Sequence, residues 1–191
     1  DGTPAIAHKH SEHLRLNYVR QENRGRSVAR NTAITAARGE FLIFIDDGRI
    51  VPPQFLDAHW AKLSAGADIL TCGPLHAVFT LFLPELLEDR HHRVSLERHL
   101  AKIHDRTRPQ AMVTDEDVLQ RLPQVLAEWA TPEPWWDEAC MPLIRHYGGK
   151  LEACPIQWVV GTTANMGVRK AHVVQVGMFD EKFTGWGVED T

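Results

Sequence analysis

The pattern of apolar residues in the first part of the chain predicts strands that alternate with helices. Residues 41–45 form an unbroken apolar run between turn-forming residues, which is typical of a strand buried on both faces of a parallel sheet. The remaining patterns predict helices over 8–16, 28–38 and 54–65 and strands over 16–20 and 68–72. This order indicates an α/β fold with a mostly parallel central sheet and flanking crossover helices.

Residues 81–150 depart from that alternation. Their helical patterns, over 83–100 and 115–129, are rich in His and Arg and are separated by polar stretches that contain proline. We therefore expect these residues to form a helical insertion within a single domain. A strand over 156–160 and a helix over 170–176 return to the α/β pattern before a glycine-rich end.

The aromatic and histidine side chains of the insertion have two interpretations each. Trp129, Trp135 and Trp136 lie near two prolines in a predicted loop, where they could stack on an acceptor molecule or form a small apolar cluster. We expect the apolar cluster. Four histidines are also close in sequence: His91, His92, His99 and His104. Because no cysteine accompanies them and their spacing is irregular, a solvated helical face is favoured over a metal site.

The composition is that of one α/β domain and argues against several other classes of protein. The chain has 191 residues, of which 43% are apolar, enough for a sizeable core. Its 21 basic and 25 acidic side chains leave a formal charge of −4, which gives no support to bulk nucleic-acid or membrane-surface binding. The partners expected are therefore small molecules or a specific acceptor. The apolar run over 77–87 contains Pro84 and Glu85 and is too short to span a bilayer.

The number and spacing of the cysteines indicate the redox state of the compartment. Cys72, Cys140 and Cys154 are an odd number, and none of them forms a CxxC pair. A disulfide framework and a zinc ribbon are therefore not expected, and a reducing compartment fits best. The default location is the cytoplasm, either free or peripheral to a membrane.

Two adjacent carboxylates end the apolar run. Asp46 and Asp47 follow the predicted buried strand directly, and ligands of open α/β sheets bind beyond the carboxyl ends of the strands. Such a pair can meet a ribose hydroxyl and a hard cation on a diphosphate. A solvated turn or a helix cap would explain the same two residues.

Two further segments carry candidate chemistry. Near the end of the chain, Trp186 lies between two glycines and offers a flat face to a sugar ring, while Glu189 and Asp190 could remove a proton from a hydroxyl. A surface turn around a packed indole is the simpler explanation. Earlier, Arg30 lies near the start of a predicted helix, an arrangement that suits an anionic phosphate. An ordinary helix with a surface ion pair is the alternative there.

The order and spacing of all these segments resemble glycosyltransferase family 2. The residues that carry the resemblance are Asp1-Gly2-Thr3, Asn23-x-Gly25, Ala29-Arg30-Asn31, Phe44-Ile45-Asp46-Asp47, the segment 161–169 with Asn165 and Arg169, and the segment 176–190. The last segment, Val-Gly-Met-Phe-Asp-Glu-Lys-Phe-Thr-Gly-Trp-Gly-Val-Glu-Asp, is also similar to galactosyltransferase C-terminal segments and to chondroitin-polymerase-type domains. The resemblance covers nearly the whole chain outside residues 81–150.

This resemblance implies a GT-A, Rossmann-like fold over residues 1–191 as one domain, truncated at both ends because the chain begins and stops inside a motif. It implies transfer of a sugar from a nucleoside diphosphate-sugar donor to a hydroxyl of a glycan or small-molecule acceptor, with inversion; a retaining reaction is the variant. The implied donor-binding residues are Asp1, Arg30, Asp46 and Asp47, with Asn165 and Arg169 in the sheet and donor pocket. The implied acceptor-site residues are Trp186 and Gly187, with Glu189 beside the catalytic base Asp190.

One position departs from the family pattern. Gly48 stands where the Asp-x-Asp motif of the family has its second, metal-binding acid. We expect a divalent cation, Mn²⁺ or Mg²⁺, held by Asp46 together with Asp47 in place of the missing acid; weak or absent metal binding is the other outcome that Gly48 leaves open. The alternative is a catalytically silent GT-A module that binds a nucleotide-sugar or glycan. The transferase hypothesis requires Asp190 and the acidic pair to face one cleft.

Overall fold

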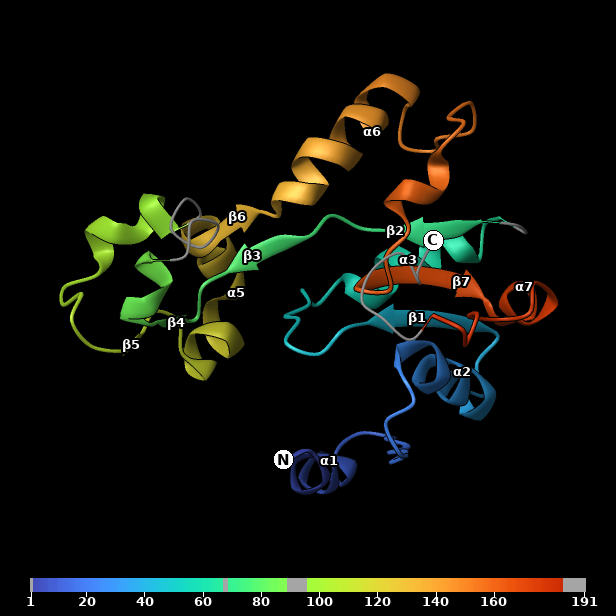
Figure 1. The fold of residues 1–191 in the computed structure, drawn as a ribbon, viewed down its shortest axis with the longest axis horizontal. Coiled ribbons are helices and arrows are strands. Elements are labelled where there is room, and N and C mark those ends of the chain that lie inside the picture. Colours follow the sequence, from blue (N-terminus) through green and yellow to red (C-terminus); the bar gives the residue numbers. More distant parts are fainter. Residues whose placement is uncertain (1, 67–68, 89–95, 184–191) are drawn as a thin grey trace.

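A computed structural model describes residues 2–66, 69–88 and 96–183, without the side chain of residue 98. Figure 1 shows a central sheet with helices on both sides and, apart from it, a second group of elements formed by the insertion. In chain order, the helices and strands are α1 (Thr3–Ser11), α2 (Arg26–Ala36), β1 (Phe41–Ile45), α3 (Phe55–Leu63), β2 (Leu70–Cys72), β3 (His76–Val78), β4 (Leu81–Phe82), η1 (Pro84–Leu87), η2 (Glu97–Lys102), β5 (Gln110–Ala111), α5 (Asp115–Trp129), β6 (Ala130–Pro132), η3 (Trp136–Cys140), α6 (Met141–Tyr147), η4 (Gln157–Val160), β7 (Asn165–Arg169) and α7 (Lys170–Gln175).

The central sheet has the strand order β1-β7-β2, and both of its ladders are antiparallel. The prediction of a mostly parallel central sheet is therefore not confirmed by the described strands. β1 and β2 do run in the same direction, as the crossover through α3 requires, but β7 lies between them and runs the opposite way. The sequence pattern misses this arrangement because β7 joins the sheet from a distant part of the chain.

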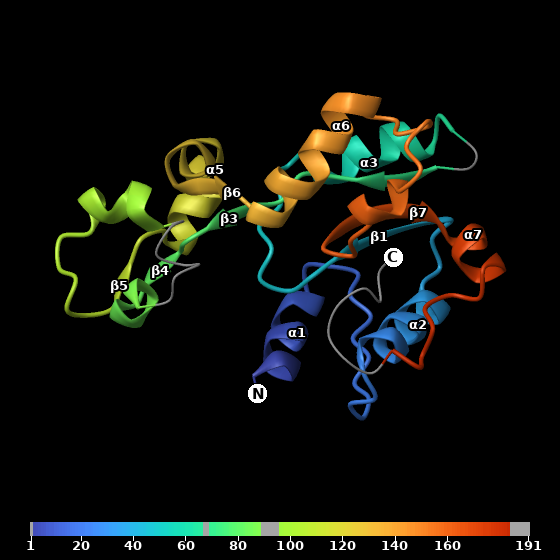
Figure 2. The same cartoon turned by 45° about the horizontal axis from the view of Figure 1, so that its top comes forward.

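The helix α2 covers one face of this sheet. It begins after Gly25, whose φ of +93° turns the chain into the helix. Val28, Asn31 and Ile34, spaced three residues apart, are buried on one side of α2. Ile34 packs against Leu42 of β1 and Val168 of β7 in one apolar cluster. The view in Figure 2 shows α2 and α3 on opposite sides of the sheet.

The strand β1 has the predicted bounds, but it is less buried than expected. Only Leu42 is fully buried, and the side chain of Ile45 is 44% exposed. β1 is one of the two edge strands of the described sheet, because its one partner there is β7. Phe41 is shielded on the α3 side by Trp60, whose ring centroid lies 5.4 Å away. The prediction of burial on both faces is therefore wrong for the described strand.

A buried polar network joins α3 to the sheet. The Nδ1 atom of His59 lies 2.7 Å from the hydroxyl of Thr71, and its Nε2 atom lies 2.9 Å from Oδ1 of Asn165. Because the Asn165 oxygen only accepts hydrogen bonds, this contact requires an N–H at Nε2 of His59. Gly167 faces this network, and a β-carbon added there would lie 2.5 Å from the Thr71 hydroxyl and 2.7 Å from His59 Nδ1. The sheet thus needs glycine at residue 167.

Gly167→Ala is expected to lower the free energy of unfolding by about 1–3 kcal/mol, because the new methyl group displaces the His59–Thr71 pair. Gly149→Ala is the matched control, since a β-carbon at Gly149 meets nothing within 4 Å. The control should change stability by less than about 0.5 kcal/mol. Urea unfolding of the full-length protein measures both variants. Equal unfolding curves for the two would show that the network does not exclude a methyl group.

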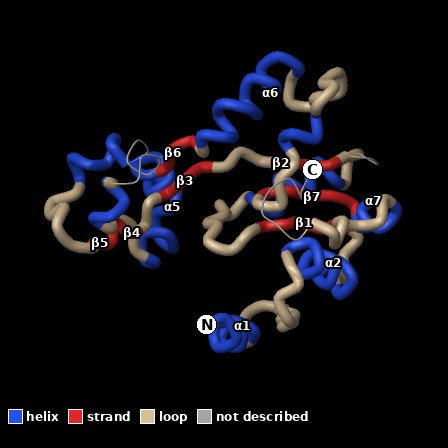
Figure 3. The backbone as a smooth tube through the Cα atoms, in the orientation of Figure 1, coloured by secondary structure: helices blue, strands red, loops and turns tan. Residues whose placement is uncertain are grey.

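Two short antiparallel ladders, β3 with β6 and β4 with β5, lie near α5, and β3 comes just before the predicted insertion over 81–150. Figure 3 shows that the remaining chain of the insertion is loop and short helix. The predicted helix over 115–129 is confirmed, with a kink at Arg121 next to Pro123. Thr114 and Asp117 form its capping box, and hydrogen bonds from the Thr114 backbone and hydroxyl lower the pKa of Asp117 to about 2.

The tryptophans of the insertion belong mainly to its apolar clusters. Trp129 ends α5 and packs with Val113 and Val125, so it does not lie in a loop as predicted. Trp136 begins η3 and is buried in a different cluster, while Trp135 is 40% exposed. The apolar-cluster interpretation is confirmed for Trp129 and Trp136.

Several other predicted elements differ from the structure. Residues 16–20 form no strand, and α1 lies earlier than the predicted helix over 8–16. Within the predicted helix over 83–100, η1 and η2 are separate 3₁₀ turns, and residues 89–95 lie outside the described residues. The apolar residues 156–160 form η4 and not a strand. None of the described helices combines the length and apolar composition that a membrane crossing requires.

Candidate functional site

The candidate site is the edge of the central sheet where β1 and β2 end and β7 begins. Ile45 pairs with Asn165 in the ladder, and the backbone N–H of Gly73, just after β2, donates to the Asn165 carbonyl at 3.3 Å. Asp46 and Asp47 therefore leave the sheet beside Asn165. Figure 1 shows this edge turned toward the insertion. The predicted placement of the acidic pair after a strand is confirmed.

The acidic pair lies in a tight, exposed turn. Both Asp46 and Asp47 are exposed to solvent, and Gly48 adopts a φ of +67°. This left-handed conformation favours glycine, and it gives a backbone reason for the glycine at the third position of the motif. A β-carbon at Gly48 would meet nothing within 4 Å, so the turn leaves room for a side chain there.

Asn165 and Arg169 lie at opposite ends of β7 and have structural contacts. The Nδ2 atom of Asn165 donates to the Pro74 carbonyl at 3.5 Å, while Oδ1 meets His59. Arg169 forms an ion pair with Glu40, and its guanidinium lies 4.7 Å from the centre of the Phe41 ring. Arg169 therefore braces the start of β1, away from the acidic pair at the end of that strand.

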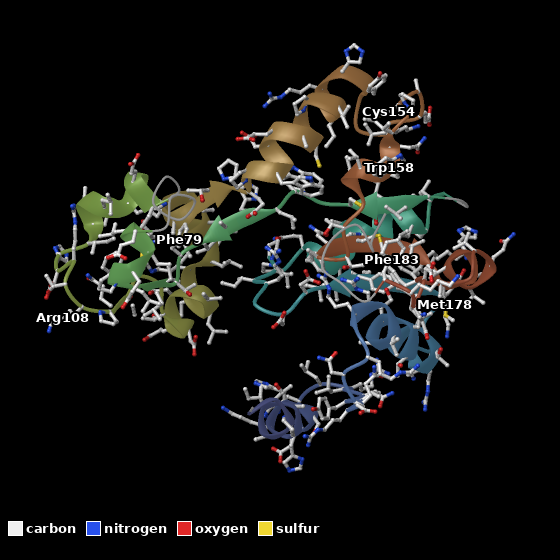
Figure 4. The ribbon with its side chains drawn as sticks, in the orientation of Figure 1. Phe79, Arg108, Cys154, Trp158, Met178 and Phe183 are labelled. Carbon is white, nitrogen blue, oxygen red and sulfur yellow. The ribbon has the colours of Figure 1, made fainter. Side chains whose placement is uncertain are left out.

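The described part of the C-terminal motif meets two of the other motifs at Phe179. The guanidinium carbon of Arg30 lies 5.4 Å from the centre of the Phe179 ring. The Phe179 and Phe44 rings form an edge-to-face pair with centroids 5.8 Å apart. Phe44 is two residues before Asp46, so Arg30, the acidic strand end and the C-terminal motif are connected through one aromatic ring. Figure 4 places the neighbouring Met178 and Phe183 beside the central sheet.

Asn31 was named above only as part of the Ala29-Arg30-Asn31 motif, and the sequence assigned it no contact or role. It is 6% exposed, and its Nδ2 donates to the Phe179 carbonyl at 2.9 Å and to a carboxylate oxygen of Glu181 at 3.1 Å. Its Oδ1 accepts from the Phe179 backbone N–H at 3.0 Å. One feature of the sequence could have indicated this role. Asn31 lies three residues from both Val28 and Ile34, on the buried side of the helix, and a buried amide requires hydrogen-bond partners.

The remaining predicted site residues lie outside the described residues. These are Asp1, Trp186, Gly187, Glu189 and Asp190. The required juxtaposition of Asp190 with the acidic pair therefore stays a prediction.

The carboxylates at the sheet edge fit a metal site that a bound diphosphate completes. Among the described residues, no group of three or more His, Cys, Asp or Glu side chains is arranged to hold a metal ion. Mg²⁺, however, is commonly bound by one or two carboxylates together with substrate phosphates. Asp46 and Asp47 fit a cation shared with a bound diphosphate.

Of the four histidines of the insertion, His99 is buried against Trp129, with ring centroids 5.1 Å apart. The interpretation as a solvated helical face is therefore wrong for His99.

The three cysteines gather around one apolar cluster next to β2. Cys140 and Cys154 are buried in it, Cys72 packs against it, and all three are free thiols. Burial raises the pKa of the Cys72 thiol to about 11 and also raises the pKa of Cys140. Because the thiolate is the reactive form, these two side chains are unsuited to nucleophilic catalysis.

A cavity of about 730 Å³ lies between α1, the segment 14–21 and α2. Its lining is mostly apolar and includes Ile6, Leu14 and Ala33. Of the predicted donor-site residues that the structure describes, Arg30, Asp46 and Asp47, none lines it. The cavity is therefore separate from the candidate site at the sheet edge.

Comparison with known proteins adds a family and several relatives. Residues 1–114 match the family described as "Glycosyl transferase family 2". The chain is 25% identical over 194 residues to "Uncharacterized glycosyltransferase YfnE" of Bacillus subtilis (strain 168), covering 100% of this chain and 48% of the relative. It is 27% identical over 192 residues to "Validoxylamine A glucosyltransferase" of Streptomyces hygroscopicus subsp. jinggangensis (strain 5008), covering 100% of this chain and 39% of the relative. The chain thus spans less than half the length of these relatives, and the family match ends before the C-terminal motif.

Proposed function

The chain belongs to glycosyl transferase family 2, and from this premise we propose that the protein transfers a sugar from a nucleoside diphosphate-sugar to an acceptor hydroxyl. The observation that carries the proposal is the convergence at Phe179. There the arginine motif, the acidic strand end and the C-terminal motif come together, although they are far apart in the sequence. The family and the names of the relatives agree with the prediction of a glycosyltransferase.

The donor binds at the sheet edge in this proposal. Asp46 accepts hydrogen bonds from the ribose hydroxyls, and Arg30 stabilises the negative charge of the diphosphate. A divalent cation held by Asp46 and Asp47 would supply further neutralisation of the leaving diphosphate. The exposed turn at Gly48 leaves both carboxylates accessible to solvent and therefore to a ligand.

Asp190 is the general base in this proposal. It takes the proton of the acceptor hydroxyl, and the oxygen attacks the anomeric carbon from the face opposite the diphosphate. The new glycosidic bond forms as the bond between the anomeric carbon and the diphosphate oxygen breaks, which inverts the anomeric configuration. Arg30 stabilises the charge that develops on the leaving oxygen. The indole of Trp186 stacks on the acceptor, with the backbone of Gly187 beside it.

A panel of nucleotides and nucleotide-sugars tests this function by thermal shift on the full-length protein, with and without Mn²⁺. A donor present at about 100 times its Kd should stabilise the protein by about 2.7 kcal/mol. For a protein of this size or larger, such stabilisation corresponds to a rise in Tm of several degrees, at about 2–4 °C per kcal/mol. Product analysis by NMR then gives the anomeric configuration. Absence of both a thermal shift and transfer would refute the proposal.

Gly48 favours one competing function, a silent module that binds the donor. A donor that raises Tm but is neither hydrolysed nor transferred with Mn²⁺ would support that alternative. The Gly48 turn is the only observation in its favour among the described residues, since the acidic pair itself lies where a donor site is expected.

A further inference from the structure

We propose that Asn31 is a positioning residue, which fixes the path of the chain into the segment that carries the candidate base. The contact itself stands on the structure alone. Its effect on catalysis rests on the proposed function, because it acts through Asp190.

Both the oxygen and the nitrogen of the Asn31 side-chain amide form hydrogen bonds with the C-terminal motif. The oxygen accepts from the Phe179 N–H, and the nitrogen donates to the carbonyl of the same residue, so the side chain pairs with that residue as a neighbouring strand would. The two residues are 148 positions apart in the sequence. The third bond, to Glu181, extends the contact further toward the end of the chain. An Asp side chain has the same shape but no donor, so it cannot replace this pairing.

The chain is bent sharply just before the residue that Asn31 holds. Gly177 and Met178 both have positive φ, +96° and +65°. The left-handed conformation is strained for Met178 and persists only where neighbouring contacts hold it. One contact is the hydrogen bond from the Met178 N–H to the Val173 carbonyl of α7, at 2.8 Å. The Asn31–Phe179 pair is the next one along the chain.

These contacts give Asn31 a role beyond local packing. Val173 of α7 holds Met178, and Asn31 of α2 holds Phe179 and Glu181, so Asn31 fixes the described end of the motif to α2. Phe183 is the last residue described, and the segment continues from it to Asp190. Misplacing a catalytic group by about 1 Å can cost about 10²-fold in rate. An effect on kcat through the position of Asp190 is therefore expected.

Hydrogen exchange of the full-length protein tests the contact without any assay of activity. Asn31→Asp and Asn31→Ala should increase the exchange rate of the Phe179 amide and its neighbours about tenfold or more, because each lost hydrogen bond contributes roughly a factor of ten. The amides of β1 should be unchanged. Thr35→Ala on the same helix is the matched control, since the Thr35 hydroxyl bonds to the carbonyl of Asn31 within the helix. Unchanged protection at Phe179 in the Asn31 variants would overturn the proposal.

A double-mutant cycle tests the role in catalysis. Asn31→Ala should lower kcat by about 10-fold to 10²-fold in the wild-type background, with the KM for the donor nearly unchanged. In the Asp190→Asn background the same substitution should cost no more than about twofold, because residues that act as a unit are not additive. Equal losses in both backgrounds would overturn the positioning role.

The two experiments separate the inference from the proposed function. If the wild-type protein transfers no sugar, the proposed function fails, while hydrogen exchange still decides whether Asn31 fixes the segment. If the Asn31 variants do not fold, Glu181→Ala takes their place, because Glu181 is exposed and loses only the third bond. That variant should show a smaller increase in exchange at the same amides. No increase would count against the proposal.

Discussion

Asp190→Asn is expected to lower kcat by about 10²–10⁴, because the amide cannot accept the proton of the acceptor hydroxyl. The KM for the donor should change little, since the donor is bound by Arg30, Asp46 and Asp47 in the proposed mechanism. Steady-state kinetics with a donor identified by the thermal-shift panel measure both quantities. The decrease of kcat at low pH, which reports protonation of the base, should disappear in the variant.

Asp180→Asn is the matched control for this substitution. Asp180 is an exposed carboxylate of the same motif, and its side chain accepts from the Lys182 N–H at 2.9 Å, a bond that an asparagine oxygen can keep. This variant should retain nearly the full kcat. Near-normal turnover of Asp190→Asn, or an equal loss in the control, would remove Asp190 from the role of base.

The elements that the sequence predicted correctly are those with a strong local pattern. The strand over 41–45 and the helix over 115–129 have the predicted bounds because each has a clear apolar pattern. The local pattern missed β7, which only the family resemblance implied to lie in the sheet, because the strand contains Gly167 and is polar at both ends. Its strand conformation depends on hydrogen bonds to β1 and β2, which lie far away in the sequence. The apolar residues 156–160 show the opposite error, since Ile156 and Trp158 are exposed on a 3₁₀ turn.

The residues of the candidate site also differ in whether a local sequence pattern could identify them. Asp46, Asp47 and Arg30 could be identified from their position relative to predicted strands and helices. The contacts of Asn31 and His59 could not be predicted, because their partners lie 148 and 106 residues away. The sequence named Asn31 only as part of a family motif, and it did not single out His59. Their importance lies in satisfying buried hydrogen-bonding groups between elements, and this is a property of the folded chain only.

The second large effect on activity is expected for substitutions of Asp46 and Asp47 in the acidic turn. Asp46→Asn should lower kcat/KM for the donor by about 10²–10³, as expected for the loss of one carboxylate that binds the ribose and would hold the cation on the leaving diphosphate. Asp47→Asn should have a comparable effect if Asp47 replaces the acid missing at Gly48, and it should also raise the Mn²⁺ concentration needed for nucleotide binding by calorimetry. Asp57→Asn is the control, because Asp57 is an exposed carboxylate in the first turn of α3.

A variant that moves the acid from residue 47 to residue 48 tests directly whether Asp47 replaces the missing acid of the motif. The double variant Asp47→Asn/Gly48→Asp restores the usual spacing of the family motif, and a β-carbon at Gly48 meets nothing within 4 Å. The φ of +67° opposes a side chain there, but aspartate is among the residues that adopt this conformation most readily, at a cost of about 1–2 kcal/mol. The double variant should therefore recover most of the Mn²⁺-dependent nucleotide binding and activity lost in Asp47→Asn. If Asp47→Asn alone has no effect, then Asp47 is not the substitute acid, and Arg30, with any cation that Asp46 holds, neutralises the leaving diphosphate.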